Sequence, residues 1–398
     1  MCLTPAEQLI LHSVILQPED DHPMRLIKLV NQVTDWNVLV DTSIALGIGS
    51  LVYHKLNDAV LKELVPQEAF DRLQQCYYVT LRRSMLLYGV FQQAARALHA
   101  AGVKVVALKG IYLSEHLYDD IGLRQLSDID LLVRAEEGER SIEILTNNGF
   151  GVTENPFSLH LTPDPDFIHY PPMQKDGLSV EIHVRLHREH PDYCIDTAAF
   201  IAHAVPVIIS GVEVHTLSFY DQLIFICIHS EKHFTGSKIQ FTCFADIANI
   251  LTSYRDEIDW SMLIKECATN KCEDVVMKHI LLVHHFFNAP VPDFILQQYS
   301  SLLGEEDMET FIRFLRGYMF TGNHVGLFNE NINKIKGFRN KIEFVAGNLF
   351  PPKGYMISRY KIKNKSLYFL WYFYRFRIVA GSMLGKIVRR TKWVKRRF

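Results

Sequence analysis

Two short apolar runs near the middle of the chain alternate in the way that β-strands do. They cover residues 103–108 and 129–133, and both consist mainly of valine, leucine and isoleucine. Because successive side chains of a strand point to opposite faces, Asp128 and Asp130 share one face, and Ile129 and Leu131 share the other. The pattern predicts two strands of a sheet, with two carboxylates on the face turned away from the core.

A third run, residues 178–184, alternates in the same manner. Its valines and isoleucine take one face, whereas Glu181 and His183 take the other. The pattern predicts a third strand that buries one side and presents an acid and an imidazole on the other, as a further wall for a site built on Asp128 and Asp130.

Helical patterns surround these strands. Residues 1 to about 100 carry apolar stripes at helical spacing that end at Gly102, and residues 136–148 form an amphipathic stretch. Ser210-Gly211 lies between two β-branched runs, which is a hairpin signal. Ser218 stands where a helix cap is expected, directly before a long apolar run. The elements predict an α+β protein in which helices flank a central sheet.

This order of elements predicts four parts. They are a helical N-terminal segment (1–100), a core that holds the sheet (101–217), a helical C-terminal domain (218–350) and a basic, aromatic tail (351–398).

Charge divides the molecule, although the formal net charge is only −2. From Lys353 onward there are 14 Lys plus Arg and no Asp or Glu, whereas the preceding 352 residues carry 28 basic and 44 acidic residues. The apolar part of this tail is shorter than the roughly 20 residues that cross a bilayer. Packing on the acidic body is favoured for 355–385, and contact with an anionic membrane or another polyanion for 386–398.

Composition agrees with a packed protein of a reducing compartment. The chain has 398 residues, of which 48% are hydrophobic and 22% charged, enough for two or three packed units. Its seven cysteines are scattered without a Cys-x-x-Cys pair, so they are predicted to be reduced thiols. The first residues lack a basic region followed by a long apolar one, which argues against a signal peptide. A cytoplasmic location is predicted, with peripheral attachment to a membrane left open.

The acids suggest a metal site. Two unit charges about 4 Å apart repel by roughly 4 kcal/mol at an effective dielectric of about 20, so a carboxylate pair calls for a cation, a proton or a solvated rim. Carboxylate oxygens suit Mg²⁺ or Mn²⁺. An isolated Asp-x-Asp is more typical of a solvated strand end or a helix cap than of a metal site. The ordered set of Lys109-Gly110, Asp128-x-Asp130 and Glu181 favours the metal site.

The same set resembles a known family. Its motifs resemble the nucleotidyltransferases of the polymerase-β superfold and, more narrowly, the bacterial group called uncharacterised nucleotidyltransferase family proteins. They are Leu108-Lys109-Gly110, Arg124, Asp128-Ile129-Asp130-Leu131-Leu132-Val133, Gly149-Phe150, Glu181-Ile182-His183, His229-x-x-x-His233 and Phe244-Ala245-Asp246-Ile247.

The resemblance implies a polymerase-β-like core and a two-metal transfer of a nucleoside monophosphate from an NTP such as ATP to an acceptor hydroxyl, with pyrophosphate leaving. Asp128, Asp130 and Glu181 would be the catalytic and metal-binding acids. The nucleotide contacts would come from Lys109, Gly110, Arg124 and Ser127. The acceptor is left open: a protein, a small molecule or a polymer end.

The chain departs from the wider superfold at its turn, which is usually Gly-Gly or Gly-Ser, because Ile111 follows Gly110 here. Lys109 could supply the phosphate contact instead, while Gly110 lets the backbone come close. Arg124 fits a phosphate contact and an ordinary surface arginine equally well. His183 could orient Glu181 or touch the acceptor, or be structural.

Two other readings stay open. His229 and His233 lie one helical turn apart and, with Asp246, could form a separate metal hydrolase site, or their face could border the acceptor pocket. Alternatively, the fold could be a non-catalytic binding or scaffold module that its basic tail docks to a membrane or a partner.

Overall fold

The structure is a computed structural model that describes residues 3–17, 22–152, 167–188, 190, 193–234, 240–316, 350, 367 and 369–374. All helices and strands given below belong to one of two units of the chain, residues 1–153 together with 166–319. The predicted contacts of the tail at 386–398 lie outside the described residues.

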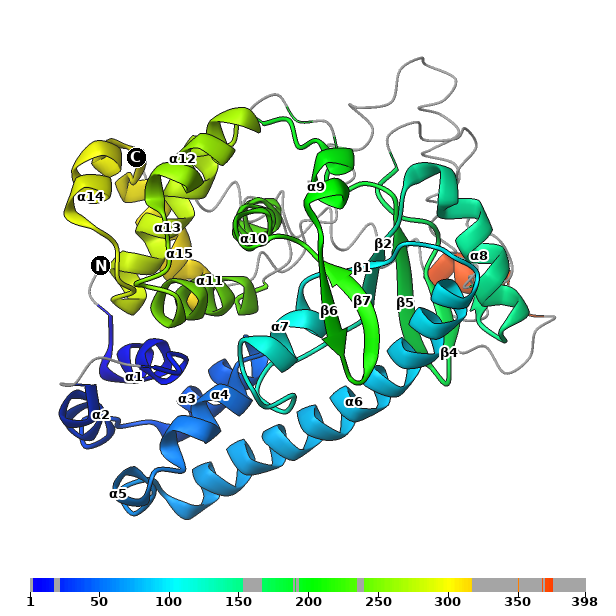
Figure 1. Cartoon of the computed structure of the whole chain (residues 1–398). Helices are drawn as coiled ribbons and strands as arrows, with labels where there is room; N and C mark the ends of the chain where they lie inside the picture. Colours follow the sequence, from blue (N-terminus) through cyan, green and yellow to red (C-terminus); the bar gives the residue numbers. More distant parts are fainter. Residues whose placement is uncertain are drawn as a thin grey trace. The chain divides into compact units, whose positions relative to one another are not determined.

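Helices dominate the described residues up to Ala100, as predicted. They are α1 (Pro5–Ser13), α2 (His22–Val30), α3 (Trp36–Ala45), α4 (Gly49–Leu56), α5 (Ala59–Lys62) and α6 (Gln67–Ala100). Figure 1 shows α6 as one long helix that runs from the N-terminal helices to the sheet and α8. It ends before Gly102, whose φ of +77° suits glycine and stops the helix.

A seven-stranded mixed sheet follows, in the order β3-β4-β5-β2-β1-β7-β6. This confirms the predicted α+β class. The strands are β1 (Val106–Ala107), β2 (Ile129–Leu132), β3 (Gly151–Val152), β4 (Met173–Lys175), β5 (Leu178–His183), β6 (Val205–Ile209) and β7 (Val212–Thr216). The predicted hairpin is confirmed, since β6 and β7 pair antiparallel around Ser210-Gly211.

Three helices and one 3-10 turn connect these strands. They are α7 (Gly110–His116), η1 (Ala135–Glu137), α8 (Gly138–Asn147) and α9 (Thr197–His203). The helices after the sheet are α10 (Phe219–Phe234), α11 (Thr242–Ser253), α12 (Trp260–Thr269), α13 (Glu273–Phe287), α14 (Asp293–Tyr299), the 3-10 turn η2 (Ser300–Leu302) and α15 (Glu305–Leu315). The Oγ of Ser218 accepts from the backbone N of Asp221, as its predicted capping role requires. None of the described helices is both long and apolar enough to cross a membrane.

Strand alternation separates the two faces of the sheet. Ile129, Leu131 and Ile182 are fully buried in a core shared with the second half of α6. Each such side chain stabilises the fold by about 1.5–3 kcal/mol relative to an exposed one. Asp130 and Glu181 therefore point to the opposite face, away from α6. The apolar half of the pattern fixes where the acids lie.

Candidate active site

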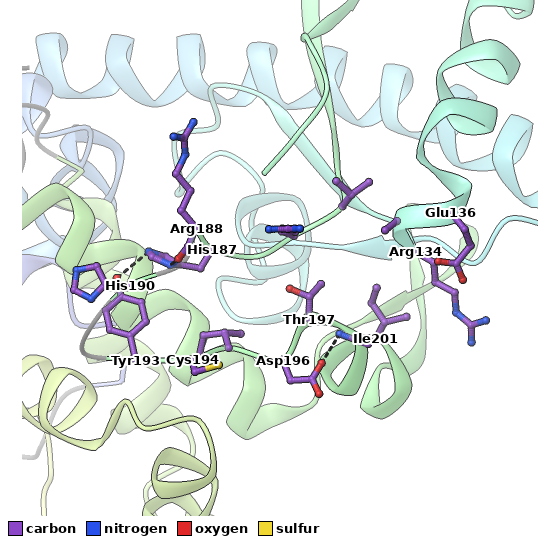
Figure 2. A pocket seen from close by; sticks show the side chains of 15 residues that line it. Arg134, Glu136, His187, Arg188, His190, Tyr193, Cys194, Asp196, Thr197 and Ile201 are labelled. Carbon is purple, nitrogen blue, oxygen red and sulfur yellow. Dashed lines mark hydrogen bonds between the residues drawn. The ribbon is translucent and has the colours of Figure 1, made fainter. Parts of the chain in front are cut away.

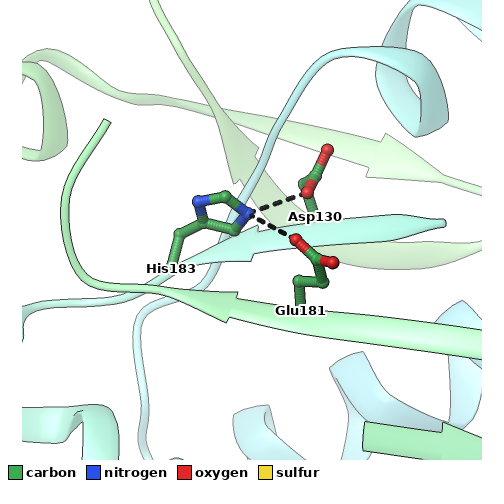
Figure 3. Close-up of side chains that lie close together, drawn as sticks. All are labelled: Asp130, Glu181 and His183. Carbon is green, nitrogen blue, oxygen red and sulfur yellow. Dashed lines mark hydrogen bonds and ion pairs between the residues drawn. The ribbon is translucent and has the colours of Figure 1, made fainter. Parts of the chain in front are cut away.

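The register of two parallel strands brings the main acids together. In the β2–β5 pair, Asp130 lies opposite Glu181 and Leu132 lies opposite His183. Residues opposite each other in neighbouring strands project to the same face, so both carboxylates stand side by side although they are far apart in sequence. Figure 3 shows the imidazole of His183 pointing at both of them.

These three side chains form a compact set of possible ligands. Asp130, Glu181 and His183 each offer one atom, and the three atoms lie within 4.8 Å of one another. His183 Nε2 is 2.8 Å from Asp130 Oδ1 and 3.5 Å from Glu181 Oε2. Asp130 and His183 are buried, while Glu181 is half-buried. A set of two carboxylates and one imidazole suits a divalent cation.

Lys109 joins this set from the turn between β1 and α7. Its Nζ lies 3.1 Å from Asp130 Oδ2 and 5.5 Å from the ring centre of Phe225 in α10. The backbone of Lys109 has φ +49° and ψ −119°, in the left-handed region that favours glycine. Such a conformation costs on the order of 1–3 kcal/mol and persists where surrounding contacts fix it. In this conformation the ammonium group of Lys109 lies beside Asp130.

The pKa values of the three carboxyl groups in the site are shifted in different directions. Burial alone would raise the pKa of Asp130, but Lys109 and His183 outweigh it and hold that pKa well below its usual range. Burial also opposes the charge of Glu181, whose pKa is lowered by the hydrogen bond from His183 and by His169. The pKa of Asp128 is raised by burial and by the neighbouring Asp130. Asp128 and Asp130 thus share one lysine, and Glu181 stands beside Asp130, so the site has room for the charge of a further cation.

Asp128 stands just before β2 and lies outside the three-residue set, unlike the predicted pair with Asp130. It faces the same cavity, and its Oδ1 accepts a hydrogen bond of 2.7 Å from Ser127 Oγ. The backbone carbonyls of Leu126 and Ser127 accept from the Arg83 guanidinium of α6, which holds this segment in place.

One cavity of about 470 Å³ collects the predicted residues. Its lining includes Lys109, Gly110, Arg124, Ser127, Asp128, Asp130, Glu181, His183 and His229. Side chains that the sequence did not single out complete the wall, among them Gln125, His169, Phe225, Lys232, Gln240 and Thr242. The roles assigned to these residues remain predictions, but their positions along one cavity are compatible with a shared ligand.

A larger hollow of about 810 Å³ adjoins the cavity, because His187 lines both. Figure 2 shows His187, His190 and Tyr193 gathered at one end of it, and Arg134 and Glu136 at the other. Tyr193 Oη lies 2.8 Å from His187 Nε2, and its ring stacks on that of His190. The hollow offers mixed polar and aromatic walls beside the cavity that the acids line.

Arg124 lies in the cavity wall, but most of its guanidinium is committed elsewhere. Its Nε and Nη2 donate to the two carboxylate oxygens of Asp246 at 2.9 and 2.6 Å, and Tyr118 Oη donates to the same carboxylate. Burial would lower the pKa of Arg124, but Asp246 raises it. The predicted phosphate contact of Arg124 is thereby confined to Nη1, which lies beside Gly110.

Arg124 leaves no room for a side chain at position 110. A Cβ at position 110 would lie 2.3 Å from Arg124 Nη1 and 2.5 Å from Leu126 Cδ2, both shorter than any normal contact. The positive φ in this turn belongs to Lys109, and Gly110 is not among the residues with positive φ. Glycine at 110 therefore makes room for a buried ion pair, and its predicted approach to phosphate remains a prediction.

Replacing Gly110 by alanine is expected to destabilise the protein by about 1–3 kcal/mol, because the added methyl group overpacks the Arg124 site. Thermal unfolding followed by circular dichroism would measure it. Gly89→Ala in α6 is the matched control, since no atom lies within 4 Å of its added Cβ. That change should stabilise the helix by about 0.5–1 kcal/mol. Equal effects of the two substitutions would contradict the packing argument.

The contacts of Asp246 argue against the separate metal site on His229, His233 and Asp246. Asp246 is 1% exposed, and both of its oxygens are used by Arg124 and Tyr118. His229 Nε2 lies 2.9 Å from Gln240 Oε1, and the side chain of His233 is outside the described residues. In the described part of the chain, the only group of three possible metal ligands is the one around Asp130. His229 instead borders the cavity, in agreement with the alternative interpretation that this helical face lines the acceptor pocket.

The sequence analysis missed His169, whose Nε2 lies 3.6 Å from Glu181 Oε2. It precedes β4, and a signal for its position exists in the dipeptide Asp176-Gly177, which joins β4 to β5 with φ values of +53° and +76°. Such a dipeptide is typical of a two-residue hairpin turn. A hairpin at this turn predicts that β4 and the residues just before it lie antiparallel to β5, the strand that carries Glu181.

Comparison with known proteins agrees with these motifs. The model of a family described as uncharacterised nucleotidyltransferase matches residues 32–288. The chain belongs to this family. The match covers the sheet, the cavity residues and helices on both sides of them. The general activity of this nucleotidyltransferase is therefore nucleotidyl transfer, and the family implies an NTP as substrate.

Two solved structures show a weaker likeness to this nucleotidyltransferase. The antibiotic-resistance factor ANT(2'')-Ia is 10% identical, with 52% of this chain and 99% of that chain covered and a TM-score of 0.32. An antigenic nucleotidyltransferase-like protein from Paracoccidioides brasiliensis is 13% identical, with 53% and 94% covered and a TM-score of 0.25. These scores are too low to carry an argument about this chain. No curated protein sequence matched it.

Proposed function

We propose that this protein transfers a nucleoside monophosphate from an NTP to an acceptor hydroxyl, with Mg²⁺ or Mn²⁺ as cofactor. The observation that carries the proposal is the alignment of Asp130 with Glu181 on adjacent strands, beside Lys109 and at the wall of one cavity. Divalent cations bound by Asp128, Asp130 and Glu181 would neutralise the phosphates and polarise the reacting oxygens.

The protein's own groups have distinct tasks in this proposal. Lys109 exchanges its contact with Asp130 for a phosphate oxygen, which its flexible ammonium group allows. The acceptor oxygen forms a bond to the α-phosphorus as the bond from that phosphorus to the leaving oxygen breaks, and pyrophosphate departs with the electron pair. Glu181 accepts the hydroxyl proton. The hollow that adjoins at His187 gives the acceptor room next to the cavity.

Binding and turnover test the proposal separately. Calorimetry with a non-hydrolysable ATP analogue and Mg²⁺ should show binding, and α-labelled NTP should pass its label to a product while γ-labelled NTP releases labelled pyrophosphate. Lys109→Gln should weaken nucleotide binding by about 10–100-fold, since a hydrogen bond to a charged group contributes roughly 1.5–3 kcal/mol. Lys265→Gln, on the exposed face of α12, is the control.

The outcomes separate the alternatives. Nucleotide binding without label transfer to any fraction of a cell extract would favour the non-catalytic binding module docked by its tail. Failure of the intact protein to bind each of the four NTPs would refute the transferase. Equal affinities of the Lys109→Gln and Lys265→Gln variants would remove Lys109 from the nucleotide site.

A further inference from the structure

A second imidazole lies beside the acids, on the far side of β5 from Asp130. The segment around His169 pairs antiparallel with the end of β5, where His169 lies opposite His183. The bonds from Tyr170 N to Ile182 O and from Val184 N to Ile168 O flank this pair, both at 2.9 Å. This is the non-hydrogen-bonded type of antiparallel pair, in which side chains approach most closely. His169 therefore stands on the same face as Glu181 and His183.

The contacts of His169 decide which of its nitrogens can act as a ligand. Its Nδ1 lies 2.8 Å from the carbonyl oxygen of Tyr170. Because a carbonyl only accepts, Nδ1 carries the hydrogen and donates it, which leaves the lone pair of the neutral ring on Nε2. That atom faces Glu181 Oε2 at 3.6 Å. With the neutral ring, two acceptors face each other, and either a proton on Nε2 or a metal ion between them satisfies the pair.

The same arrangement is typical of metal-binding histidines. Such residues usually donate their second ring N–H to a backbone carbonyl or a carboxylate, which fixes the ring and the tautomer. The His169 side chain is 36% exposed, so its Nε2 is accessible from the cavity that it lines. His183 has a different geometry, since its Nε2 donates to Asp130 at 2.8 Å. It orients that carboxylate.

We infer that His169 is a nitrogen ligand of the metal centre, paired with Glu181, and that this ligand makes the centre select Mn²⁺ over Mg²⁺. The inference rests on the proposed function, which supplies the metal centre itself. Imidazole is a poor ligand for Mg²⁺, which prefers oxygen and water, whereas affinity for nitrogen sites rises along the first transition row from Mn²⁺. The selectivity would be a property of this chain's own pocket.

Electron paramagnetic resonance with Mn²⁺ alone tests the inference without any turnover. Full-length protein should bind Mn²⁺ in the presence of a tenfold excess of Mg²⁺, and pulsed spectra of the bound ion should show coupling to one ¹⁴N nucleus. His169→Gln should remove this coupling and weaken Mn²⁺ binding by about tenfold or more, by analogy with the loss of metal-site partners. His99→Gln, exposed in the last turn of α6, is the matched control and should change neither.

Other outcomes would overturn the inference in distinguishable ways. Bound Mn²⁺ without nitrogen coupling in the unmodified protein means an all-oxygen centre, which refutes the role of His169 and leaves the proposed function intact. Coupling that survives His169→Gln but disappears in His183→Asn assigns the ligand to His183 instead. Failure of the unmodified protein to bind Mn²⁺, both alone and with a non-hydrolysable ATP analogue, would refute the inference and the proposed metal-dependent transfer together.

Discussion

Asp130→Asn is expected to lower the rate of pyrophosphate release by about 10³-fold or more. The amide keeps the shape of the side chain but removes the charge that would hold a cation, and several kcal/mol of transition-state stabilisation correspond to this factor at about 1.4 kcal/mol per tenfold. Initial rates with Mg²⁺ or Mn²⁺ and saturating NTP, measured by a coupled pyrophosphate assay, would give the effect. An Asp130→Asn rate within a few-fold of the unmodified protein would refute the assignment of this acid.

Folding must be separated from chemistry in that experiment. Asp130 is the charge partner of Lys109, whose side chain is only 17% exposed, so the single substitution leaves a poorly solvated ammonium group without its partner. The double variant Lys109→Met with Asp130→Asn removes both charges and should recover stability while remaining inactive. Asp256→Asn, exposed and away from the cavity lining, should keep full activity.

Arg124→Met is expected to destabilise the protein by about 3–5 kcal/mol, because it leaves the carboxylate of Asp246 charged and buried. At roughly 2–4 °C per kcal/mol for a unit of this size, the midpoint of thermal unfolding should fall by on the order of 10 °C. Circular dichroism would follow the transition. The variant Arg124→Met with Asp246→Leu replaces the whole pair by apolar groups and should regain most of the loss.

A surface ion pair provides the comparison. Arg72 of α6 pairs with Asp41 of α3 at the protein surface, and exposed pairs contribute about 0–1 kcal/mol. Arg72→Met should therefore shift the midpoint of unfolding by at most a few degrees. If Arg124→Met and Arg72→Met lowered stability equally, the buried pair would not have the structural importance that its geometry indicates.

Local patterns in the sequence predicted many elements and one important orientation. Alternation placed the side chain of Asp130 on the face opposite Ile129, because the period of a strand is two residues and one face had to be buried. The stop of α6 at Gly102, the Ser210-Gly211 hairpin and the cap at Ser218 were also confirmed. Each of these features depends on residues that are close in sequence.

Local sequence patterns did not predict the contacts between segments that are far apart in the chain. Nothing local indicates that Asp246 of α11 binds Arg124. From the sequence, Arg124 was therefore interpreted either as a phosphate ligand or as a surface residue. Asp246 was interpreted as a possible metal ligand for the same reason. Pairing partners so far apart are selected by the packing of whole helices against the sheet, which a single stretch of sequence does not encode.

The position of His169 shows the same limit on a smaller scale. The turn at Asp176-Gly177 sets Met173 opposite Val180, and an unbroken register would then place Tyr170 opposite His183. The segment before β4 contains one residue more than β5 does over the same stretch, so His169, and not Tyr170, lies opposite His183. A shift of one residue moves a side chain to the other face of the sheet.

The sequence by itself therefore determined the family, the α+β class and the face on which Asp130, Glu181 and His183 lie, because these depend on motifs and on strand period. Tertiary structure alone decided that Asp130 stands in register with Glu181, that Lys109 lies beside Asp130 and that His169 lies beside Glu181. The physical reason is that strand pairing and register are settled by long-range packing, whereas the direction of each side chain along a strand is settled locally.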